Sequence, residues 1–409
     1  MKILCVFGRH NYGNPARGLS YEYSNFLPAF RNLGHEVVHF ESWSRAEYQN
    51  FADLNQAFLE AVESVRPDVI FCVLMHYELW LEVLENLRRN CPATLIHWGT
   101  DDSWKYEQFS RWVAAPFHVH ATTAHSAMDK ARRDGLTNFV STQWAANSAN
   151  FQEPLPASQC RYPVSFVGSA YGHRPRWITD LKKKGVDVEC FGYGWRNGPV
   201  GSEEIPTILR GSVLSLSFAD SGLHLGRQGL YRSRQIKARV FEVPGAGGCL
   251  LTQNAPHLSE YYLPDKEIAT FEDPSGLAEA IRWLLANPDR RDAIARAGHA
   301  RTVREHMYEQ RFGELLAVAA TRGTPQDRRS AGFYRFDRDW FAGLRRRHAV
   351  GEITRMAARC AVAPLSALVG ARRGPRAARR LTFELSWRLS GRKTYTSAGL
   401  PGRLFYRES

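Results

Sequence analysis

Apolar and polar positions alternate in blocks along the first 145 residues. Short apolar runs, each long enough for one buried strand, are KILCVF (2–7), EVVHF (36–40), DVIFCVL (68–74), ATLIHW (93–98), FHVHATT (117–123) and NFVST (138–142). Helical patterns are found between them, at 21–34, 51–65 and 78–89. Continuous apolar strands that alternate with helices are typical of a parallel sheet covered on both faces. We therefore expect a doubly wound α/β domain over residues 1–150.

The same pattern restarts after a segment without periodicity. Residues 145–163 are rich in Asn, Ser and Pro and are the best candidate for an interdomain linker. Strands are then expected at 164–168, 186–192, 212–218, 248–253 and 266–271, and helices at 174–185, 203–211, 235–247, 275–288 and, as one long helix, 289–321. Residues 160–322 form a second Rossmann-like domain in this prediction. Two such domains imply a cleft between the carboxyl ends of their sheets, where ligands bind.

The charge is spread unevenly along the chain. With 409 residues, 44% hydrophobic and 23% charged, the composition excludes collagen, coiled coil and wholesale disorder. The chain has 54 Lys and Arg against 41 Asp and Glu, and residues 326–409 hold 19 of the former and 6 of the latter. The formal charge of +13 therefore lies in this basic C-terminal extension. Residues 1–325 are balanced, so they indicate no nucleic acid partner.

Cysteine usage and the N-terminus both indicate a cytoplasmic protein. The chain has 7 cysteines without CxxC spacing, mostly in apolar runs, and the odd number argues against a complete disulfide framework. Gly8 and Arg9 interrupt the first apolar run, so no signal peptide is expected. The nearest approach to a membrane span, residues 360–371, is short and contains Pro364. We expect a chain that does not cross a membrane.

The segment 235–252, QIKARVFEVPGAGGCLLT, carries the most informative chemistry. Glu242 is expected on a helix, where its carboxylate can accept two hydroxyl donors at once, which suits the 2′ and 3′ hydroxyls of a ribose. Basic residues that could neutralise a diphosphate, and glycines that allow close backbone approach, are Arg234, Lys237, Arg239, Gly245, Gly247 and Gly248. An ordinary α/β unit with a glycine helix cap and surface charges is the alternative, and spacing alone favours it.

Two turns at predicted strand ends could also contact a nucleotide. In GSAYGHR (168–174), backbone N–H groups of Gly168 and Ser169 before a helix would favour a phosphate, and His173 would add charge. In FGYGW (191–195), Tyr193 or Trp195 could stack on the base. A plain strand-to-helix turn and ordinary packing are the alternatives.

An acidic pair and several histidines follow strands of the first domain. Asp101 and Asp102 come directly after the strand at 93–98 and could supply a general base that deprotonates an acceptor hydroxyl; capping of the next helix is the competing interpretation. His118 and His120 share one strand face, but no third ligand accompanies them at zinc-like spacing. We interpret these histidines as structural and expect no metal site.

Most of the second domain resembles a known family. The ordered series FVGS (166–169), GWRNG (194–198), KARVFEVPGAGG (237–248), KEI (266–268) and GHARTVREHMYEQR (298–311) is similar to the C-terminal half of GT-B glycosyltransferases, specifically the CgeB-like (spore-maturation-type) branch of the family-1 transferases. The resemblance implies two Rossmann-like domains, a nucleotide diphosphate sugar held mainly by the second, and no obligatory metal or other cofactor. Glu242 takes the place of the ribose-binding glutamate. Arg234 stands where related retaining transferases carry a second glutamate, so their mechanism is not carried over.

The GT-B architecture implies further roles outside these motifs. The polar loop 8–23 would face the cleft and bind the acceptor through Arg9, Asn11, Tyr12 and Arg17, with a purely structural loop as the alternative. The loop 221–234 is expected to be flexible and to cover the donor. Its arginines Arg227, Arg232 and Arg234 would grip the pyrophosphate, unless they are solvated surface charges.

The extension 326–409 combines 18 arginines and Lys393 with Phe333, Tyr334, Phe336, Trp340 and Phe341, and an amphipathic stretch covers 349–371. Basic and aromatic residues together suit adsorption to an anionic membrane surface, the inner face of the cytoplasmic membrane in this prediction. Binding of RNA or of a partner protein, and a disordered solvated tail, are the alternatives.

The sequence thus predicts a metal-independent GT-B glycosyltransferase. It would move a sugar from a nucleotide diphosphate sugar to a hydroxyl acceptor, either a glycan, a lipid-linked glycan or a protein, as in polysaccharide biosynthesis. The alternatives are a non-catalytic nucleotide-sugar-binding or scaffold protein on the same fold, and a nucleic-acid binder that acts through its tail.

Overall fold

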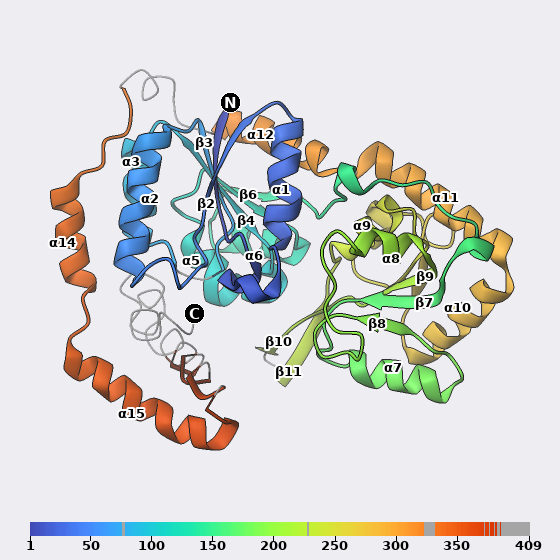
Figure 1. Cartoon of the computed structure of the whole chain (residues 1–409). Helices are drawn as coiled ribbons and strands as arrows, with labels where there is room; N and C mark the ends of the chain where they lie inside the picture. Colours follow the sequence, from blue (N-terminus) through green and yellow to red (C-terminus); the bar gives the residue numbers. More distant parts are fainter. Residues whose placement is uncertain are drawn as a thin grey trace. The chain divides into compact units, whose positions relative to one another are not determined.

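The computed structural model describes residues 1–75, 78–226, 229–322, 332–371, 373–375, 377–379, 381–382 and 385. These residues divide into two compact units. The first consists of Met1–Tyr23, Phe30–Ser141 and the described residues from Leu315 on, and the second of Ser24–Ala29 and Thr142–Glu314. Each unit contains one parallel sheet with helices around it (Figure 1).

The first unit is built on a six-stranded sheet with the order β2-β1-β3-β4-β5-β6, in which all neighbours are parallel. The strands are β1 (Lys2–Val6), β2 (Glu36–Phe40), β3 (Val69–Cys72), β4 (Thr94–Gly99), β5 (Val119–Thr122) and β6 (Phe139–Ser141). The helices are α1 (Tyr21–Asn32), α2 (Phe51–Val65), α3 (Leu81–Asn90), α4 (Asp102–Lys105), α5 (Arg111–Val113), α6 (His125–Arg133), α14 (Arg338–His348) and α15 (Glu352–Val369), with a π-helical turn at Tyr106–Ser110.

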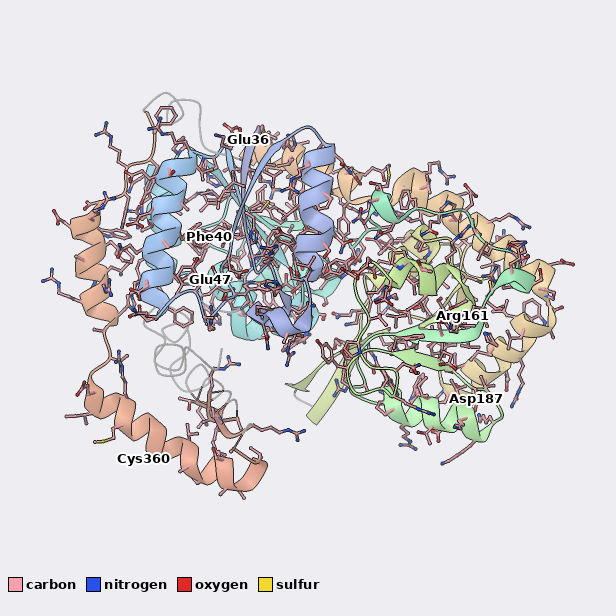
Figure 2. All side chains as sticks on the ribbon, in the orientation of Figure 1. Glu36, Phe40, Glu47, Arg161, Asp187 and Cys360 are labelled. Atoms are coloured by element: carbon pink, nitrogen blue, oxygen red, sulfur yellow. The ribbon has the colours of Figure 1, made fainter. Side chains whose placement is uncertain are left out.

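Side chains on both faces of this sheet are buried, as continuous apolar strands predict. Leu4 and Ile70 pack with the buried faces of α2 and α3 in one core, which also contains Phe40, labelled at the end of β2 in Figure 2. On the opposite face, the ring of Phe30 in α1 lies 5.0 Å from that of Phe71. The predicted doubly wound sheet is therefore present.

The second unit repeats this architecture with five parallel strands in the order β13-β12-β9-β7-β8. The strands are β7 (Tyr162–Val167), β8 (Glu189–Phe191), β9 (Ser212–Ser217), β12 (Leu250–Gln253) and β13 (Ala269–Phe271). The helices are α7 (Arg174–Lys183), α8 (Ile205–Arg210), α9 (Arg239–Gly245), α10 (Pro274–Ala286) and α11 (Pro288–Glu305), and α12 (Tyr308–Arg322) begins in this unit and ends in the first. One core lies under α7 and α10 and another under α8 and α9.

Two local predictions about the second unit were wrong. The segment expected as a flexible loop, 221–234, forms the antiparallel hairpin β10 (Asp220–Gly226) and β11 (Gly229–Arg234), apart from Arg227 and its neighbour, which lie outside the described residues. The long helix expected at 289–321 is two helices. It breaks at His306 and Met307 because the backbone of Ala146 inserts there, accepting from the N–H of Tyr308 at 3.1 Å and donating to His306 at 2.9 Å.

The C-terminal extension is not a free tail in its first part. Tyr334, Phe336, Phe341 and Leu344 are buried in the same core as α2 and α3, and α14 packs against α2 (Figure 1). Three of the five aromatic residues predicted to meet a membrane therefore stabilise the first unit instead, and only Phe333 among the five is strongly exposed, at 65%. Lys393 lies outside the described residues.

The cysteines are free thiols, as predicted. Five are buried, Cys160 is partly exposed, and Cys360, labelled on α15 in Figure 2, is exposed.

Candidate functional site

The turn after β7 lies beside the turn after β8 in the second unit. The N–H of Gly168 donates to the carbonyl of Phe191 at 2.8 Å, and that of Ala170 donates to Tyr193 at the same distance. Gly192 has a φ of +129°, and a Cβ there would collide with the Gly168 carbonyl, so only glycine allows this approach. Ser169 and Tyr193, which is 43% exposed, therefore lie together at the carboxyl edge of the sheet, where ligands of α/β domains bind.

His173 is engaged by an acidic residue. Its Nε2 atom lies 2.7 Å from the carboxylate of Asp220, which is 3% exposed, and its ring stacks on Trp177. Burial lowers the pKa of His173, as do nearby arginines, and Asp220 acts in the opposite direction. Gly172 faces both Asp220 and Arg232, whose guanidinium donates to the carbonyl of Ser221 at 3.0 Å.

Two of the predicted phosphate-binding arginines already have carboxylate partners. Arg239 pairs with Glu242 at 3.0 Å in the first turn of α9, and both side chains are 19% exposed. Arg234, at the end of β11, forms an ion pair with Glu272 and also donates to the Glu272 carbonyl at 2.9 Å. A diphosphate would have to compete with these carboxylates for the two guanidinium groups. Lys237 lies in the turn before α9 and is partly exposed.

The glycines at the end of α9 allow close approach by another segment of the protein itself. Gly247 has a φ of +82°, and a Cβ there would collide with the carbonyl of Gln152. A Cβ on Gly245 would collide with Ala146. The close approach predicted for a ligand is thus made by residues 146–153, and Gly247 holds that segment against α9. The donor contact predicted for Gly247 stays a prediction.

In the first unit, Asp102 is the centre of a buried network. Its carboxylate accepts hydrogen bonds from Ser110 and from Nε2 of His120, the latter at 2.9 Å, and only 2% of the residue is exposed. Burial alone would raise the pKa of Asp102, but His120 and the hydrogen bonds lower it to about 2. Both carboxylate oxygens of Asp102 are engaged inside the protein, so we interpret Asp102 as a structural residue.

The network continues through two histidines and defines their tautomers. The backbone N–H of Leu74 can only donate, and it lies 3.4 Å from Nε2 of His97. Nδ1 of His97 therefore carries the proton and donates to Nδ1 of His120 at 3.0 Å, which leaves Nε2–H of His120 to donate to Asp102. Burial, with His120, holds the pKa of His97 well below its usual value. The structural role predicted for His120 agrees with these contacts, and that predicted for His118 agrees with the hydrogen bond that its Nδ1 accepts from the N–H of Leu95 at 3.0 Å.

Asp101 and Glu22 form a different acidic group at the carboxyl edge of the first sheet. Asp101 precedes α4, makes no capping hydrogen bond, and lies 3.6 Å from Nζ of Lys105. Glu22, in the first turn of α1, is 8% exposed. Burial, with the charge of Asp101 acting in the same direction, raises the pKa of Glu22 to about 7 against the opposing effects of its own backbone N–H and of Lys105. Sequence reasoning missed Glu22 because glutamate is ordinarily exposed on an amphipathic helix.

The predicted acceptor residues of the β1–α1 loop differ in their surroundings. Asn11 holds the loop closed, since its Nδ2 donates to the carbonyls of Arg17 and Leu19 at 3.1 and 2.8 Å. Tyr12 is 60% exposed with a φ of 56°, and the guanidinium of Arg17 lies over its ring. The guanidinium of Arg9 lies over Tyr23. Asn11 thus stabilises the conformation of the loop, whereas the side chains of Tyr12 and Arg17 contact each other.

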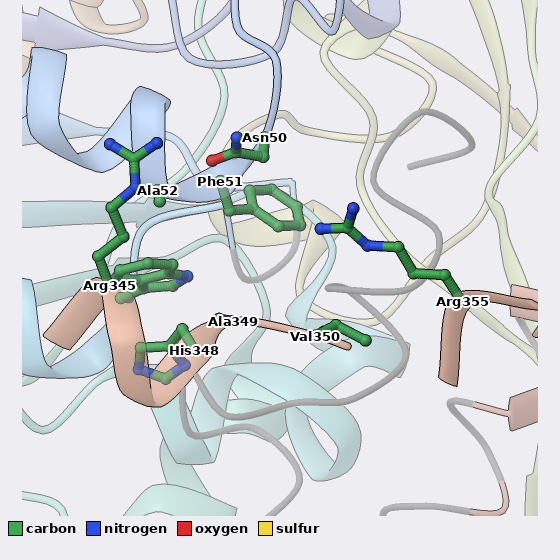
Figure 3. Close-up of a pocket in the computed structure, with 9 residues that line it drawn as sticks. Asn50, Phe51, Ala52, Arg345, His348, Ala349, Val350 and Arg355 are labelled. Atoms are coloured by element: carbon green, nitrogen blue, oxygen red, sulfur yellow. The ribbon is translucent and has the colours of Figure 1, made fainter. Parts of the chain in front are cut away.

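A cavity of about 200 Å³ lies where the C-terminal extension meets the first unit. Phe51 and Trp80 line it with Arg345, His348 and Arg355, and Figure 3 shows the Arg355 side chain pointing toward Phe51. Arg345 also pairs with Asp53 of α2 at 3.0 Å.

Comparisons with known proteins agree with this architecture. Residues 174–317 match the family described as glycosyl transferase-like. No curated protein is similar in sequence. Similar solved structures include a sucrose-phosphate synthase from Thermosynechococcus elongatus (11% identity, TM-score 0.56, 78% of this chain and 100% of that one). Another is a glycosyltransferase from Rickettsia africae (10% identity, TM-score 0.54, 78% of this chain and 98% of that one). A third is HepE from Anabaena in complex with UDP and glucose (11% identity, TM-score 0.52, 78% of this chain and 99% of that one).

At these identities the structural likeness concerns the fold, which is GT-B: two units, each with a parallel sheet. Together with the match over most of the second unit, it supports a glycosyltransferase.

Proposed function

We propose that this protein transfers a sugar from a nucleotide diphosphate sugar to a hydroxyl acceptor without a metal ion, as members of the CgeB-like branch of family-1 transferases do. The observation that carries the proposal is the carboxyl edge of the second sheet, four of whose five strands (β8, β9, β12 and β13) lie in the matched region. There the turn after β7, the exposed Tyr193 ring and the Arg239–Glu242 pair lie on neighbouring elements. HepE, which shares the fold, was solved with UDP and glucose.

Each group at this edge suits one part of such a donor. The Glu242 carboxylate can accept two ribose hydroxyls while Arg239 still donates to it. Lys237 and Arg232 suit a diphosphate, and the Tyr193 ring suits a base. The N–H groups of Gly168 and Ala170 are already engaged by the turn after β8, so the phosphate contact predicted for the Gly168 N–H is not part of this proposal. Arg234 is held by Glu272, so it is not assigned to the phosphates in this proposal.

Donor binding tests this proposal directly. Calorimetric titration with UDP, UDP-glucose and the corresponding guanosine compounds should show binding of at least one, unaffected by EDTA. Glu242→Ala should weaken it about tenfold or more, because two hydrogen bonds to a charged acceptor are lost. Glu279→Ala, an exposed glutamate on α10, is the matched control and should bind normally. Absence of binding by every nucleotide, or equal affinity in Glu242→Ala, would contradict the proposal.

We also propose that the enzyme works at an anionic membrane surface, docked through α15. No helix in the described part of the chain is long and apolar enough to span a bilayer. On α15, Ile353 (81% exposed), Met356 (62%) and Leu368 (80%) form one stripe about 120° wide. Val362 and Leu365, toward the other side, pack against Ala378. The exposed Arg373, after the end of α15, supplies a cation, which contributes about 1 kcal/mol near an anionic surface.

Vesicle sedimentation distinguishes this docking from other uses of the extension. Binding to vesicles with phosphatidylglycerol, weaker binding to pure phosphatidylcholine, and loss of binding in Ile353→Glu/Leu368→Glu are expected. Leu285→Glu, on α10 of the second unit, replaces a residue that is 40% exposed and should bind like the unaltered protein. Equal vesicle binding by the α15 variant, or binding only to RNA, would contradict membrane docking.

A further inference from the structure

Glu22 occupies a position that few glutamates share. It is almost completely buried, yet no ion pair to it occurs among the residues that the structure describes. Its carboxylate accepts a hydrogen bond from its own backbone N–H. A buried carboxyl without a cation is unfavourable in its charged form. Such a group is retained at a cost to stability, which is typical of functional sites.

The local structure holds Glu22 at the carboxyl edge of the sheet. The hydroxyl of Ser20 donates to the carbonyl of Gly8 at 2.5 Å and accepts from the N–H of Tyr23 at 3.0 Å, which ties the start of α1 to the end of β1. Asp101 and Lys105 come from the segment after β4. Lys105 also donates to the carbonyl of Met75, after β3, at 3.4 Å. Three strand ends thus contribute to the surroundings of Glu22.

Among the described residues, Asp101 and Lys105 are the charged groups that act on Glu22. They are paired with each other, with 3.6 Å between Nζ of Lys105 and a carboxylate oxygen of Asp101, so one negative and one positive group act on Glu22 together. Asp102, fully engaged by His120 and Ser110, is not available as a third.

We propose that Glu22 is the catalytic base of the transferase reaction, and that Asp101 and Lys105 are positioning residues that tune its proton affinity. This role rests on the proposed function. As the acceptor oxygen bonds to the anomeric carbon, the bond from that carbon to the diphosphate oxygen breaks and its electron pair leaves with the nucleoside diphosphate. The acceptor proton moves to the Glu22 carboxylate. The step consumes one donor and one acceptor and needs no other reactant.

The first test needs no substrate. Because the folded protein binds the Glu22 proton more tightly than the unfolded chain does, ionisation of Glu22 costs stability as the pH rises from about 4.5 to about 7. Glu22→Gln should therefore melt at a higher temperature than the unaltered protein at pH 8, with a difference that shrinks toward pH 5. A glutamate with a purely structural role would give a lower melting temperature in the variant at pH 8, and that result would overturn the proposal.

The second test follows turnover as release of nucleoside diphosphate, with water as acceptor and with the nucleotide sugar that binds best. Glu22→Gln should lose roughly 10²–10⁴-fold in rate while its calorimetric donor affinity stays within about twofold. The rate of the unaltered protein should rise with pH to a plateau above about 7. This limb should move to lower pH in Asp101→Asn, which removes a negative charge near Glu22, and to higher pH in Lys105→Met, which removes a positive one.

A Glu22→Gln rate within threefold of the unaltered one, or a limb that neither variant moves, would overturn the assignment of the base. Failure of the proposed function is distinguishable, because the unaltered protein would then bind no nucleotide sugar at all. In that case the assignment of the base falls with it, whatever the melting temperatures show.

Discussion

The carboxylate of Asp102 accepts a hydrogen bond from Nε2 of His120 at 2.9 Å, and both side chains lie inside the first unit. The pair connects α4, which follows β4, to β5, and through His97 it reaches the backbone after β3. A chain of hydrogen bonds therefore connects three strand ends. Asp101 directly precedes Asp102, so this chain also fixes the position of its backbone.

Removing the centre of the network should cost stability. Asp102→Ala leaves His120 and Ser110 without their acceptor in a buried place, and we expect a loss of about 2–4 kcal/mol in the free energy of unfolding. Urea denaturation measures it. Asp129→Ala removes a carboxylate that is 72% exposed and paired only at the surface of α6, and it should change stability by less than about 0.5 kcal/mol. Equal effects of the two substitutions would contradict the network.

Gly99 is required by the same carboxylate. A Cβ at this position would overlap the carboxyl group of Asp102. Gly99→Ala should therefore destabilise the protein by roughly 1–3 kcal/mol. Gly313→Ala is the matched control, because nothing lies within 4 Å of its missing Cβ and it is inside α12, where alanine is the better helix former. Thermal unfolding should show opposite shifts, and a loss of stability in both variants would contradict this account.

The fold could be predicted because its signal is local. Apolar runs such as DVIFCVL are recognisable from their own composition, and β3 (Val69–Cys72) is found inside that run. The candidate site depends instead on partners far apart in sequence. Arg234 meets Glu272, and His173 meets Asp220, across 38 and 47 positions, so no spacing rule indicates that these charges are already engaged.

The same limit explains why the sequence pointed to Asp101 and Asp102 as candidate bases and not to Glu22. Asp101 and Asp102 attracted attention because they are adjacent and follow a strand, but only tertiary packing shows that Asp102 is enclosed by His120 and Ser110. Glu22 belongs to a helix that begins YEYSNF, where nothing marks it as buried. The aromatic residues of the extension raised the same difficulty, since composition cannot distinguish a membrane anchor from a core residue.

His306 should make the protein sensitive to acid. Burial lowers its pKa to about 4, against the hydrogen bond that its Nε2 donates to the Tyr261 carbonyl, and Arg311, which donates to its Nδ1, acts in the same direction as burial. The unfolded chain binds a proton at higher pH than the folded one, so stability is full above about 6.5 and is lost as the pH falls toward about 4. The loss should be roughly 3 kcal/mol. Urea midpoints between pH 7 and pH 4 should fall less in His306→Asn, and parallel curves would exclude His306 as the cause.

Leu344 should matter more to stability than its place in a basic extension suggests. It is fully buried against α2 and α3, so Leu344→Ala should cost about 2–5 kcal/mol through lost burial and the cavity left behind. Leu368→Ala, at a residue that is 80% exposed on α15, should leave unfolding unchanged and weaken vesicle binding.

Because residues 334–344 complete the core of the first unit, a chain ending after residue 350 should fold, whereas one ending after residue 325 should expose the core and aggregate. If both truncated chains unfold at the same urea concentration as the full chain, residues 334–344 do not belong to the core of the first unit.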